Sequence, residues 1–214
     1  MEYAVTETFT SIQGESSMQG LLCYFIRMAG CNLSCSYCDT LYAAKGSEFK
    51  IMTLDNLLNE AVLSGAGLAE ITGGEPLMQD CISLSNALLK KGIKVLIETN
   101  GSMDVSGLPI EVKKIIDIKT PGSGNPDFLF ENLLHISPED EIKFVITGRD
   151  DYEWALKKVS EWKLTQKTSE IIFSPAYKKM EPEKLALWIK EDRIRVRLQI
   201  QLHKYIWPGR DRGV

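Results

Sequence analysis

Three cysteines lie close together in the stretch CNLSCSYCDT, residues 31–40. Cys31, Cys35 and Cys38 follow a CxxxCxxC spacing, and clustered thiolates are typical ligands of a metal ion or a metal cluster. A cubic iron–sulfur cluster usually takes four cysteines, so three would leave one iron open to a ligand from outside the protein. Such an open, redox-active iron could activate a bound cofactor. The spacing therefore favours a [4Fe-4S] cluster with three protein ligands.

A zinc site is the alternative that the same cysteines leave open. A closed structural zinc site needs four ligands, commonly as two CxxC pairs, and the chain has no second pair. We interpret the two histidines, His135 and His203, as surface or hydrogen-bonded residues rather than ligands. Cys23 and Cys81 lie among apolar residues, so we expect them to be small core residues. A zinc-stabilised binding module would be colourless when purified, whereas an iron–sulfur protein would be brown.

Short apolar runs alternate with helix-like segments along the chain. The runs are nearly continuously apolar, which is typical of strands covered on both faces. A βα series of this kind predicts an α/β fold with parallel strands, and seven strands in 214 residues suggest one domain over 1–214, built as a shortened, open (partial) TIM-type barrel. The expected strands are 21–28, 68–72, 94–99, 114–118, 141–146, 170–175 and 195–202.

Helix signals fall between several of these runs. Thr53 precedes an apolar stripe as a candidate cap, and Asp150 with Glu153 resembles a capping box. A helix over 82–91 is expected to end before a glycine, and Pro182 sits early in another helix. These helices would cover the outside of the barrel.

Polar and glycine-rich loops follow five of the expected strands. They read AGCNLSCSYCDT, GGEP, NG, KTPGSG and SPAY. Ordinary turn chemistry would explain any one of these loops, but not a cysteine cluster on the same edge. Barrel enzymes place their chemistry at the carboxyl ends of the strands, so the loops predict one composite active site.

Composition and charge narrow the class of partner. The net charge is −4, and the basic residues are scattered apart from the C-terminal stretch KYIWPGRDRGV, which we interpret as a solvated end rather than an RNA contact. We therefore expect a small-molecule substrate and no direct nucleic-acid partner. The first residues lack a secretory signal, and no apolar run reaches the roughly 18 residues of a membrane span, so we expect a cytoplasmic protein without a membrane partner.

Two motifs together resemble the radical S-adenosylmethionine (SAM) superfamily. CNLSCSYC, with Tyr37 before its last cysteine, resembles the superfamily's CxxxCxxC motif, and Thr72–Pro76 resembles its GGEP motif, which holds the amino group of the methionine moiety. The resemblance implies a radical SAM core whose [4Fe-4S] cluster binds S-adenosyl-L-methionine and reduces it to give a 5′-deoxyadenosyl radical. The protein would then place that radical beside one C–H bond and exclude water.

Further motifs resemble one family within it, the 7-carboxy-7-deazaguanine synthases, over nearly the whole chain. They are SIQGE (11–15), FIR (25–27), CDT (38–40), ETNG (98–101), DIKTP (117–121), KFV (143–145) and LHK (202–204). The resemblance implies a carbon–nitrogen lyase that converts 6-carboxy-5,6,7,8-tetrahydropterin into 7-carboxy-7-deazaguanine with loss of ammonia, on the path to queuosine in tRNA. It also implies Mg²⁺, a flavodoxin or ferredoxin as reductant, and a homodimer.

The same resemblance assigns roles to residues. Arg27 would bind the substrate carboxylate, a role that suits a planar guanidinium, although a surface arginine paired with a helix acid is the plainer interpretation. Thr40 would give an oxygen to magnesium, although by itself it reads as a helix or turn cap. Pro208 aligns with a terminus that touches substrate in shorter relatives, but six more residues follow it here. The implied substrate contacts are Ile12, Gln13, Gly14, Arg27, Thr72 and Pro208. The implied cofactor contacts are Tyr37, Cys38, Asp39, Gly74, Asp117, Ile118, Lys119, Ser174, Pro175, Ala176 and Tyr177.

The reaction that this family resemblance implies starts by hydrogen abstraction from C6 of the pterin. The ring then contracts in a magnesium-stabilised rearrangement, and the hydrogen returns to regenerate SAM. A glycyl-radical activating enzyme, whose substrate is another protein, is the alternative within radical chemistry. It would account for the cysteines and GGEP, but not for SIQGE or for Arg27 with Thr40 nearby.

Overall fold

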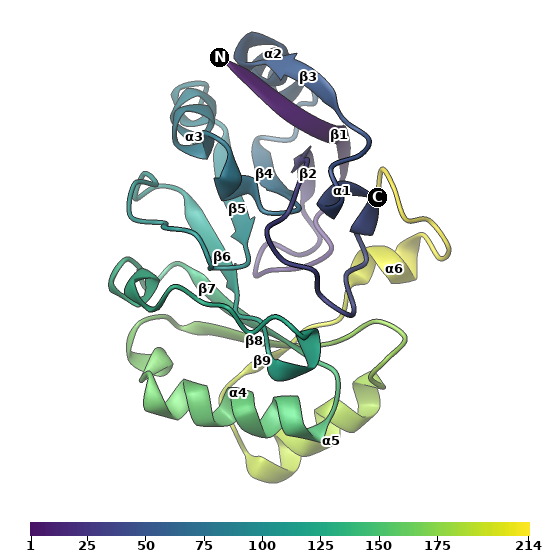
Figure 1. The fold of residues 1–214 in the computed structure, drawn as a ribbon, viewed down its shortest axis with the longest axis vertical. Helices are drawn as coiled ribbons and strands as arrows, with labels where there is room; N and C mark the ends of the chain where they lie inside the picture. The colour runs from purple at the N-terminus through teal and green to yellow at the C-terminus, as the bar shows by residue number, and fades with distance from the viewer.

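The computed structural model describes all 214 residues and shows one open, curved sheet. Its nine strands follow the order β3-β1-β2-β4-β5-β6-β7-β8-β9 (Figure 1). From β2 to β9 neighbouring strands run parallel, whereas β1 is antiparallel to both β2 and β3. The strands are β1 Glu2–Ile12, β2 Leu22–Met28, β3 Lys50–Thr53, β4 Leu68–Gly73, β5 Lys94–Thr99, β6 Lys113–Asp117, β7 Glu141–Ile146, β8 Glu170–Pro175 and β9 Arg197–Leu198.

Helices cover the convex face of this sheet. Helices α2 and α3 pack on one half of the sheet and α4 and α5 on the other, while the short α1 and α6 lie near the C-terminus (Figure 1). The helices are α1 Leu41–Ala44, α2 Leu54–Leu63, α3 Cys81–Lys90, α4 Arg149–Glu161, α5 Pro182–Asp192 and α6 Leu202–Ile206. Four 3₁₀ turns are η1 Pro76–Met78, η2 Pro121–Ser123, η3 Phe130–Leu134 and η4 Leu164–Gln166. None of the helices is long and apolar enough to cross a membrane.

Two large apolar cores lie between the sheet and these helices. The first contains 20 buried residues and joins β1, β2, β4 and β5 to α2 and α3. The second contains 13 and joins β6, β7 and β8 to α4 and α5. Strands covered in this way need apolar residues on their outer face, which accounts for the near-continuous apolar runs of the sequence.

The inner face of the sheet has an apolar layer beneath a charged one. Cys23, Phe25, Leu68, Leu96 and Ile115 are buried together inside the curve of the sheet. Because side chains alternate along a strand, the residue two positions further on points to the same face. On β2, β4, β5 and β6 that residue is charged, and each one borders the same cavity: Arg27, Glu70, Glu98 and Asp117.

The strand predictions were confirmed for six of the seven runs, with bounds that differ by one residue at most. The run 195–202 forms only the two-residue β9, and α6 begins at Leu202. Strands β1 and β3 were missed because their residues are partly polar and mostly half-buried or exposed, unlike the apolar runs used as the signal.

Most helix predictions were confirmed, but one cap was wrong. Thr53 accepts a hydrogen bond from Asn56 N at the start of α2, and Pro182 opens α5. The capping box at Asp150 does not form, because Gly148 is the N-cap of α4. The neighbouring Asp151 instead accepts from Thr147 N and from Gly122 N of the preceding loops, so it fixes those loops to the helix.

Candidate active site

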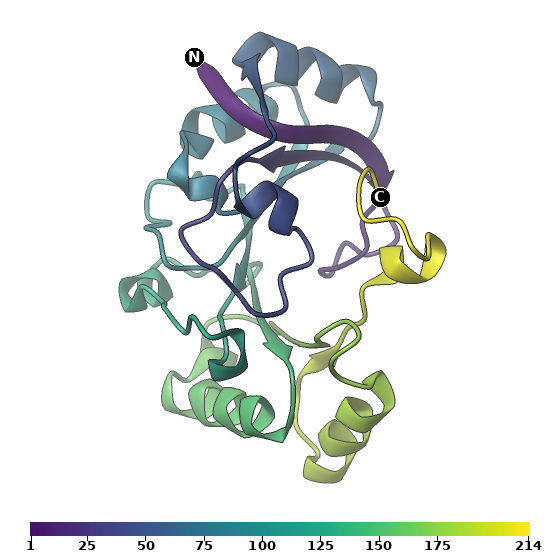
Figure 2. The ribbon, with the colours of Figure 1, turned by 45° about the vertical axis from the view of Figure 1, so that its right-hand side comes forward.

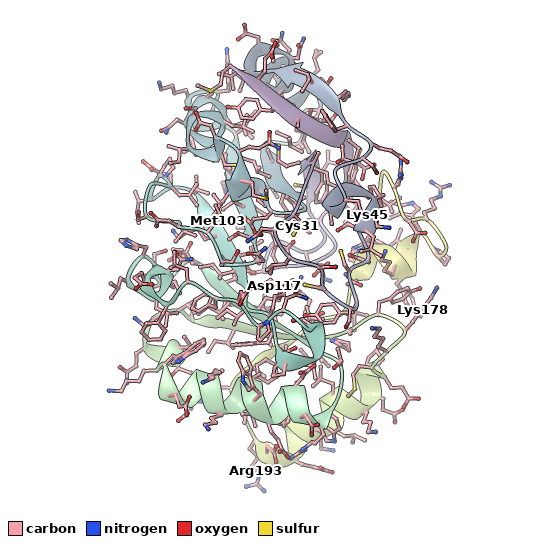
Figure 3. All side chains as sticks on the ribbon, in the orientation of Figure 1. Cys31, Lys45, Met103, Asp117, Lys178 and Arg193 are labelled. Carbon is pink, nitrogen blue, oxygen red and sulfur yellow. The ribbon has the colours of Figure 1, made fainter.

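A cavity of about 330 Å³ opens at the carboxyl ends of the strands. The loop after β2 borders it, and so do the ends of β4 to β8 and residues from α6. Figure 3 shows Cys31 from that loop and Asp117 from the end of β6 near the centre of the molecule. The cavity brings together 18 residues that the sequence singled out: Ile12, Gln13, Gly14, Arg27, Cys31, Cys35, Tyr37, Cys38, Asp39, Thr40, Thr72, Gly74, Asp117, Lys119, Ser174, Pro175, Ala176 and Tyr177.

The three clustered cysteines are free, half-buried thiols on one wall of the cavity, whereas Cys23 and Cys81 are buried in the cores as expected. Burial raises the pKa of the Cys31 thiol. Burial also raises the pKa of Cys35, although the ammonium group of Lys119 opposes the shift. Metal ligation needs the thiolate form, and a cation or cluster bound to these three thiols would offset the effect of burial.

The cysteine loop presents three thiols to the cavity, and no three His, Cys, Asp or Glu side chains in the structure are grouped to hold one metal ion. The loop that carries the thiols is fixed at its middle, where Ser36 N donates to Ser123 O at 2.8 Å and Lys179 Nζ donates to Ser36 O at 2.7 Å.

The GGEP loop approaches the cysteine loop closely. Gly73 has a φ of +129°, which favours glycine, and a Cβ on Gly74 would overlap the carbonyl oxygen of Gly30. Glu75 N donates to that same oxygen at 2.8 Å. The Glu75 carboxylate is fully buried and already bonded within the protein, so the main chain of the two glycines is what this loop presents to the cavity.

Most charged side chains of the cavity form ion pairs with one another. Lys143 donates to Glu15 and, at 2.8 Å, to Glu98. Burial alone would raise the pKa of Glu15, but Lys143 and His203 outweigh it and lower the pKa to about 2. Glu70 forms no ion pair, and burial together with the negative charges of Glu98 and Glu15 raises its pKa well above its usual range, although Lys143 opposes the shift. Its partner is Gln13, whose Nε2 donates to it.

Two buried polar atoms of cavity residues have no partner in the protein, Tyr37 Oη and Asp117 Oδ1. Lys119 Nζ donates to Asp117 Oδ2 at 2.7 Å, but Asp117 Oδ1 is buried and accepts no hydrogen bond. Buried polar atoms are normally hydrogen-bonded, so an orphan of this kind at a cavity wall fits a ligand hydroxyl or amine. Asp117 thus supports the expectation that a polar cofactor binds here.

Arg27 and Thr40 both border the cavity with side-chain atoms that the protein uses only in part. Arg27 Nε donates to Glu7 Oε1 at 2.8 Å, so its acidic partner lies on strand β1 and not on a helix. Thr40 precedes α1 as its N-cap residue, but the side chain makes no capping bond. Its Oγ1 lies 3.7 Å from Cys38 Sγ. This weak contact is the only hydrogen bond of the hydroxyl, so its oxygen keeps a lone pair for a ligand.

Two of the singled-out residues lie away from the cavity. Ile118 is fully buried in the second core, and Pro208 is exposed beyond α6. Asp211 and Val214, from the stretch interpreted as a solvated end, border the cavity instead.

Other cavity residues carried no assigned role in the sequence. Among them are Glu15, Glu70, Glu98, Lys143, Gln201, His203 and Lys204. His203, interpreted as a surface or hydrogen-bonded residue, lies so close to Gly14 that a Cβ on Gly14 would overlap its ring. His203 and Gln201 both lie at the start of α6. The sequence alone does not show that this helix start reaches the cavity.

Comparison with known proteins agrees with this geometry. Residues 25–189 match the family model described as the radical SAM superfamily. The chain is 42% identical to 7-carboxy-7-deazaguanine synthase of Koribacter versatilis, over 98% of this chain and 99% of that protein. It is 41% identical to the protein of the same name from Chlorobaculum tepidum, over 98% and 96%.

Solved structures show the same fold. The crystal structure of QueE from Escherichia coli has a TM-score of 0.80 and 25% identity, and the match covers 95% of each chain. Streptococcus suis SuiB bound to S-adenosylmethionine has a TM-score of 0.55 at 16% identity, over 80% of this chain and 45% of that one, which is a likeness of fold alone.

Proposed function

The chain belongs to the 7-carboxy-7-deazaguanine synthase family of the radical SAM superfamily, and on that premise we propose that it converts 6-carboxy-5,6,7,8-tetrahydropterin into 7-carboxy-7-deazaguanine with loss of ammonia. One observation carries the proposal: a single cavity has the three thiols on one wall and the Arg27 guanidinium on another. The three thiols suit a cluster that binds SAM, and the guanidinium suits the carboxylate of the substrate. A glycyl-radical activating enzyme acts on a protein substrate, and it would not need the Arg27 guanidinium to bind a carboxylate.

The cofactor would lie between the cysteine loop and the strand ends. Cys31, Cys35 and Cys38 would hold the [4Fe-4S] cluster, the main chain at Gly74 would face the methionine end of SAM, and the unpartnered Asp117 oxygen would accept a hydrogen bond from it. Together the cluster and SAM supply a radical that abstracts hydrogen. The remaining expected contacts border the same cavity: Tyr37, Asp39, Lys119, Ser174, Pro175, Ala176 and Tyr177.

The substrate would bind on the side of β1 and β2. The terminal nitrogens of Arg27 would take its carboxylate, and main-chain groups of Ile12, Gln13 and Gly14 would take the flat pterin edge. Thr72 would add a polar contact from β4. The apolar layer beneath these groups keeps water from the far side of the ring, which protects a radical from other hydrogen donors.

Magnesium is part of the proposal through Thr40. Its side-chain oxygen is not used as a cap and borders the cavity. Mg²⁺ usually keeps several waters and takes few protein ligands, so one hydroxyl together with substrate oxygens is a sufficient site. We further propose a flavodoxin or ferredoxin as the reductant, a homodimer, and a cytoplasmic location where the five free cysteines stay reduced.

The test is an anaerobic assay with the reconstituted protein, SAM, dithionite, magnesium and 6-carboxy-5,6,7,8-tetrahydropterin deuterated at C6. We expect a product with the mass of 7-carboxy-7-deazaguanine, and label in 5′-deoxyadenosine or SAM. Turnover of the free pterin with no added protein separates this function from that of a glycyl-radical activating enzyme. Cleavage of SAM without any pterin product would leave the radical chemistry in place and refute the substrate.

A further inference from the structure

Glu7 lies directly opposite Arg27 on the antiparallel strands β1 and β2. The register shifts by one residue between Val5 and Glu7, so β1 has a bulge there. Without the extra residue, Thr6 would face Arg27. The bulge instead brings a carboxylate beside the guanidinium, as a cross-strand pair of opposite charges that stabilises this part of the sheet.

Glu7 also binds a residue of helix α1, which follows the cysteine loop. Tyr42 Oη donates to Glu7 Oε1 at 2.8 Å, the same oxygen atom that accepts from Arg27 Nε at 2.8 Å. Burial together with Glu7 raises the pKa of Tyr42 against the opposing charge of Arg27, so the phenol keeps its proton and remains a donor. Tyr42 belongs to α1, two residues after Thr40. The three side chains therefore connect β2, β1 and α1.

We propose that Glu7 and Tyr42 are positioning residues that hold the Arg27 guanidinium in the orientation that binds the substrate carboxylate. The proposal rests on the proposed function, in which Arg27 binds that carboxylate. Neither Glu7 nor Tyr42 stood out in the sequence as a site residue. Their effect would reach the substrate only through Arg27.

The contacts of Arg27 leave its free end pointing in one direction. Glu7 takes the Nε donor, and the ring of Phe9 lies 5.6 Å from the guanidinium carbon and limits its movement on one face. The two terminal nitrogens make no hydrogen bond within the protein and form the planar fork that matches a carboxylate. An arginine without such contacts would lose rotamer freedom on binding, and that loss would weaken affinity.

The C-terminal residues contact Tyr42, and Figure 2 shows the C-terminus beside the end of the purple strand β1. The guanidinium of Arg212 lies over the Tyr42 ring, with 4.3 Å between its carbon and the ring centre, and Arg212 Nη2 donates to Glu48 at 2.8 Å. Tyr42 Oη also approaches the carbonyl oxygen of Asp211 at 3.2 Å. A cation over the ring holds the tyrosine in place, so the tail supports the orientation of Tyr42.

The experiment measures binding of two ligands to the SAM-loaded, cluster-containing protein by anaerobic equilibrium dialysis. One ligand is 6-carboxy-5,6,7,8-tetrahydropterin, and the other is 5,6,7,8-tetrahydropterin, which lacks the carboxylate. Glu7→Met keeps the length of the side chain but removes the acceptor. We expect it to lower the preference for the carboxylated ligand by about tenfold, or about 1.4 kcal/mol, and to leave affinity for the other ligand unchanged. Glu7→Gln, which keeps an acceptor oxygen, should restore most of the preference.

Two further variants make the outcomes distinct. Arg27→Ala should abolish the preference altogether, and Glu2→Ala, on the exposed start of the same strand, should not change it. If Arg27→Ala keeps the preference, the assigned carboxylate site of the proposed function is wrong, and this inference is wrong with it. If Arg27→Ala loses the preference but Glu7→Met keeps it, only the positioning role is overturned.

Tyr42→Phe keeps the proposal testable if the Glu7→Met protein does not fold. It removes one hydroxyl, and we expect about a threefold loss of preference because a single neutral hydrogen bond contributes modestly. An unchanged preference in Tyr42→Phe would remove Tyr42 from the proposal and, without a folded Glu7 variant, overturn it. Cleavage of SAM in the absence of pterin should be unchanged in Glu2→Ala, because Glu2 lies at the exposed start of β1 and does not border the cavity.

Discussion

Replacement of Glu75 by glutamine tests whether the GGEP loop is held by its buried carboxylate. Oε1 of Glu75 accepts from Leu77 N at 3.0 Å and from Thr99 Oγ1 at 2.8 Å, and Oε2 accepts from Asn100 N at 2.8 Å. All of these partners are donors. Burial raises the pKa of Glu75, yet these hydrogen bonds oppose the shift, so the loop is built to hold the carboxylate form.

The magnitude follows from the geometry. In Glu75→Gln the amide oxygen can still accept from Leu77 N and Thr99 Oγ1. The NH₂ group then faces Asn100 N, so two donors meet and neither has an acceptor. A buried donor left unsatisfied costs about 1–3 kcal/mol. For a domain of this length about 1 kcal/mol corresponds to roughly 2–4 °C in Tm, so a loss near 2 kcal/mol lowers Tm by roughly 4–8 °C.

The assay is thermal unfolding of the iron-free protein followed by circular dichroism, so that loss of the cluster does not enter the comparison. The matched control is Glu139→Gln, an exposed glutamate whose change should alter stability by less than about 0.5 kcal/mol. A Glu75→Gln protein that melts together with wild type would refute the assignment of these hydrogen bonds as the fastening of the loop. It would then be the glycine packing against Gly30 that holds the two loops together.

Other expected outcomes concern the cysteines, the glycine contact and pH. Cys35→Ser should lose the iron and its brown colour after anaerobic reconstitution, whereas Cys81→Ala should keep both; equal iron in the two proteins would contradict the ligand assignment. Gly74→Ala should lower both SAM affinity and cluster content by at least about tenfold, measured by dialysis and iron analysis, because the added Cβ overlaps Gly30 O. The pKa of Glu15 is lowered from 4.5 to about 2 on folding, so its contribution to stability is complete above about pH 5 and is lost as the pH falls from 4.5 toward 2. In urea titrations the free-energy difference between wild type and Glu15→Gln should therefore shrink as the pH is lowered from 6 to 4, and a constant difference would contradict the shift.

The sequence predicted the parallel part of the fold because those strands are covered on both sides. Their apolar runs stand out from any neighbouring segment, and the loops that follow them carry the cysteines and GGEP. The same criterion missed β1, whose stretch TETFTS is half exposed and mostly polar. It also overestimated the last strand, where Arg197 and Leu198 alone pair with β8 before the chain turns into α6.

The charged half of the site could not be predicted from the sequence for a different reason. Glu70 and Lys143 sit inside otherwise apolar strands, and only the twist and register of the sheet decide that they point inward and not toward a helix. Contacts such as that of Gln201 with Glu15 join residues 186 positions apart. Spacing along the chain carries no information on such a pair. The three cysteines of CxxxCxxC lie within eight residues, so the sequence alone shows that they are close together.

The pairing of charges explains how so polar a cavity can lie above an apolar core. Each cation of the inner face has an acid of its own: Arg27 pairs with Glu7, Lys119 with Asp117, and Lys143 with Glu15 and Glu98. Glu70 is the acid left without a cation, and the rise in its pKa shows that burial favours its neutral form. Glu70→Gln copies that neutral form and still offers an oxygen to Gln13. Because a raised pKa means that the ionised acid costs stability at high pH, the variant should be at least as stable as wild type at pH 8, and the gap should close as the pH falls. A variant that is less stable than wild type at pH 8 but not at low pH would show instead that Glu70 is charged in the folded protein and stabilises it.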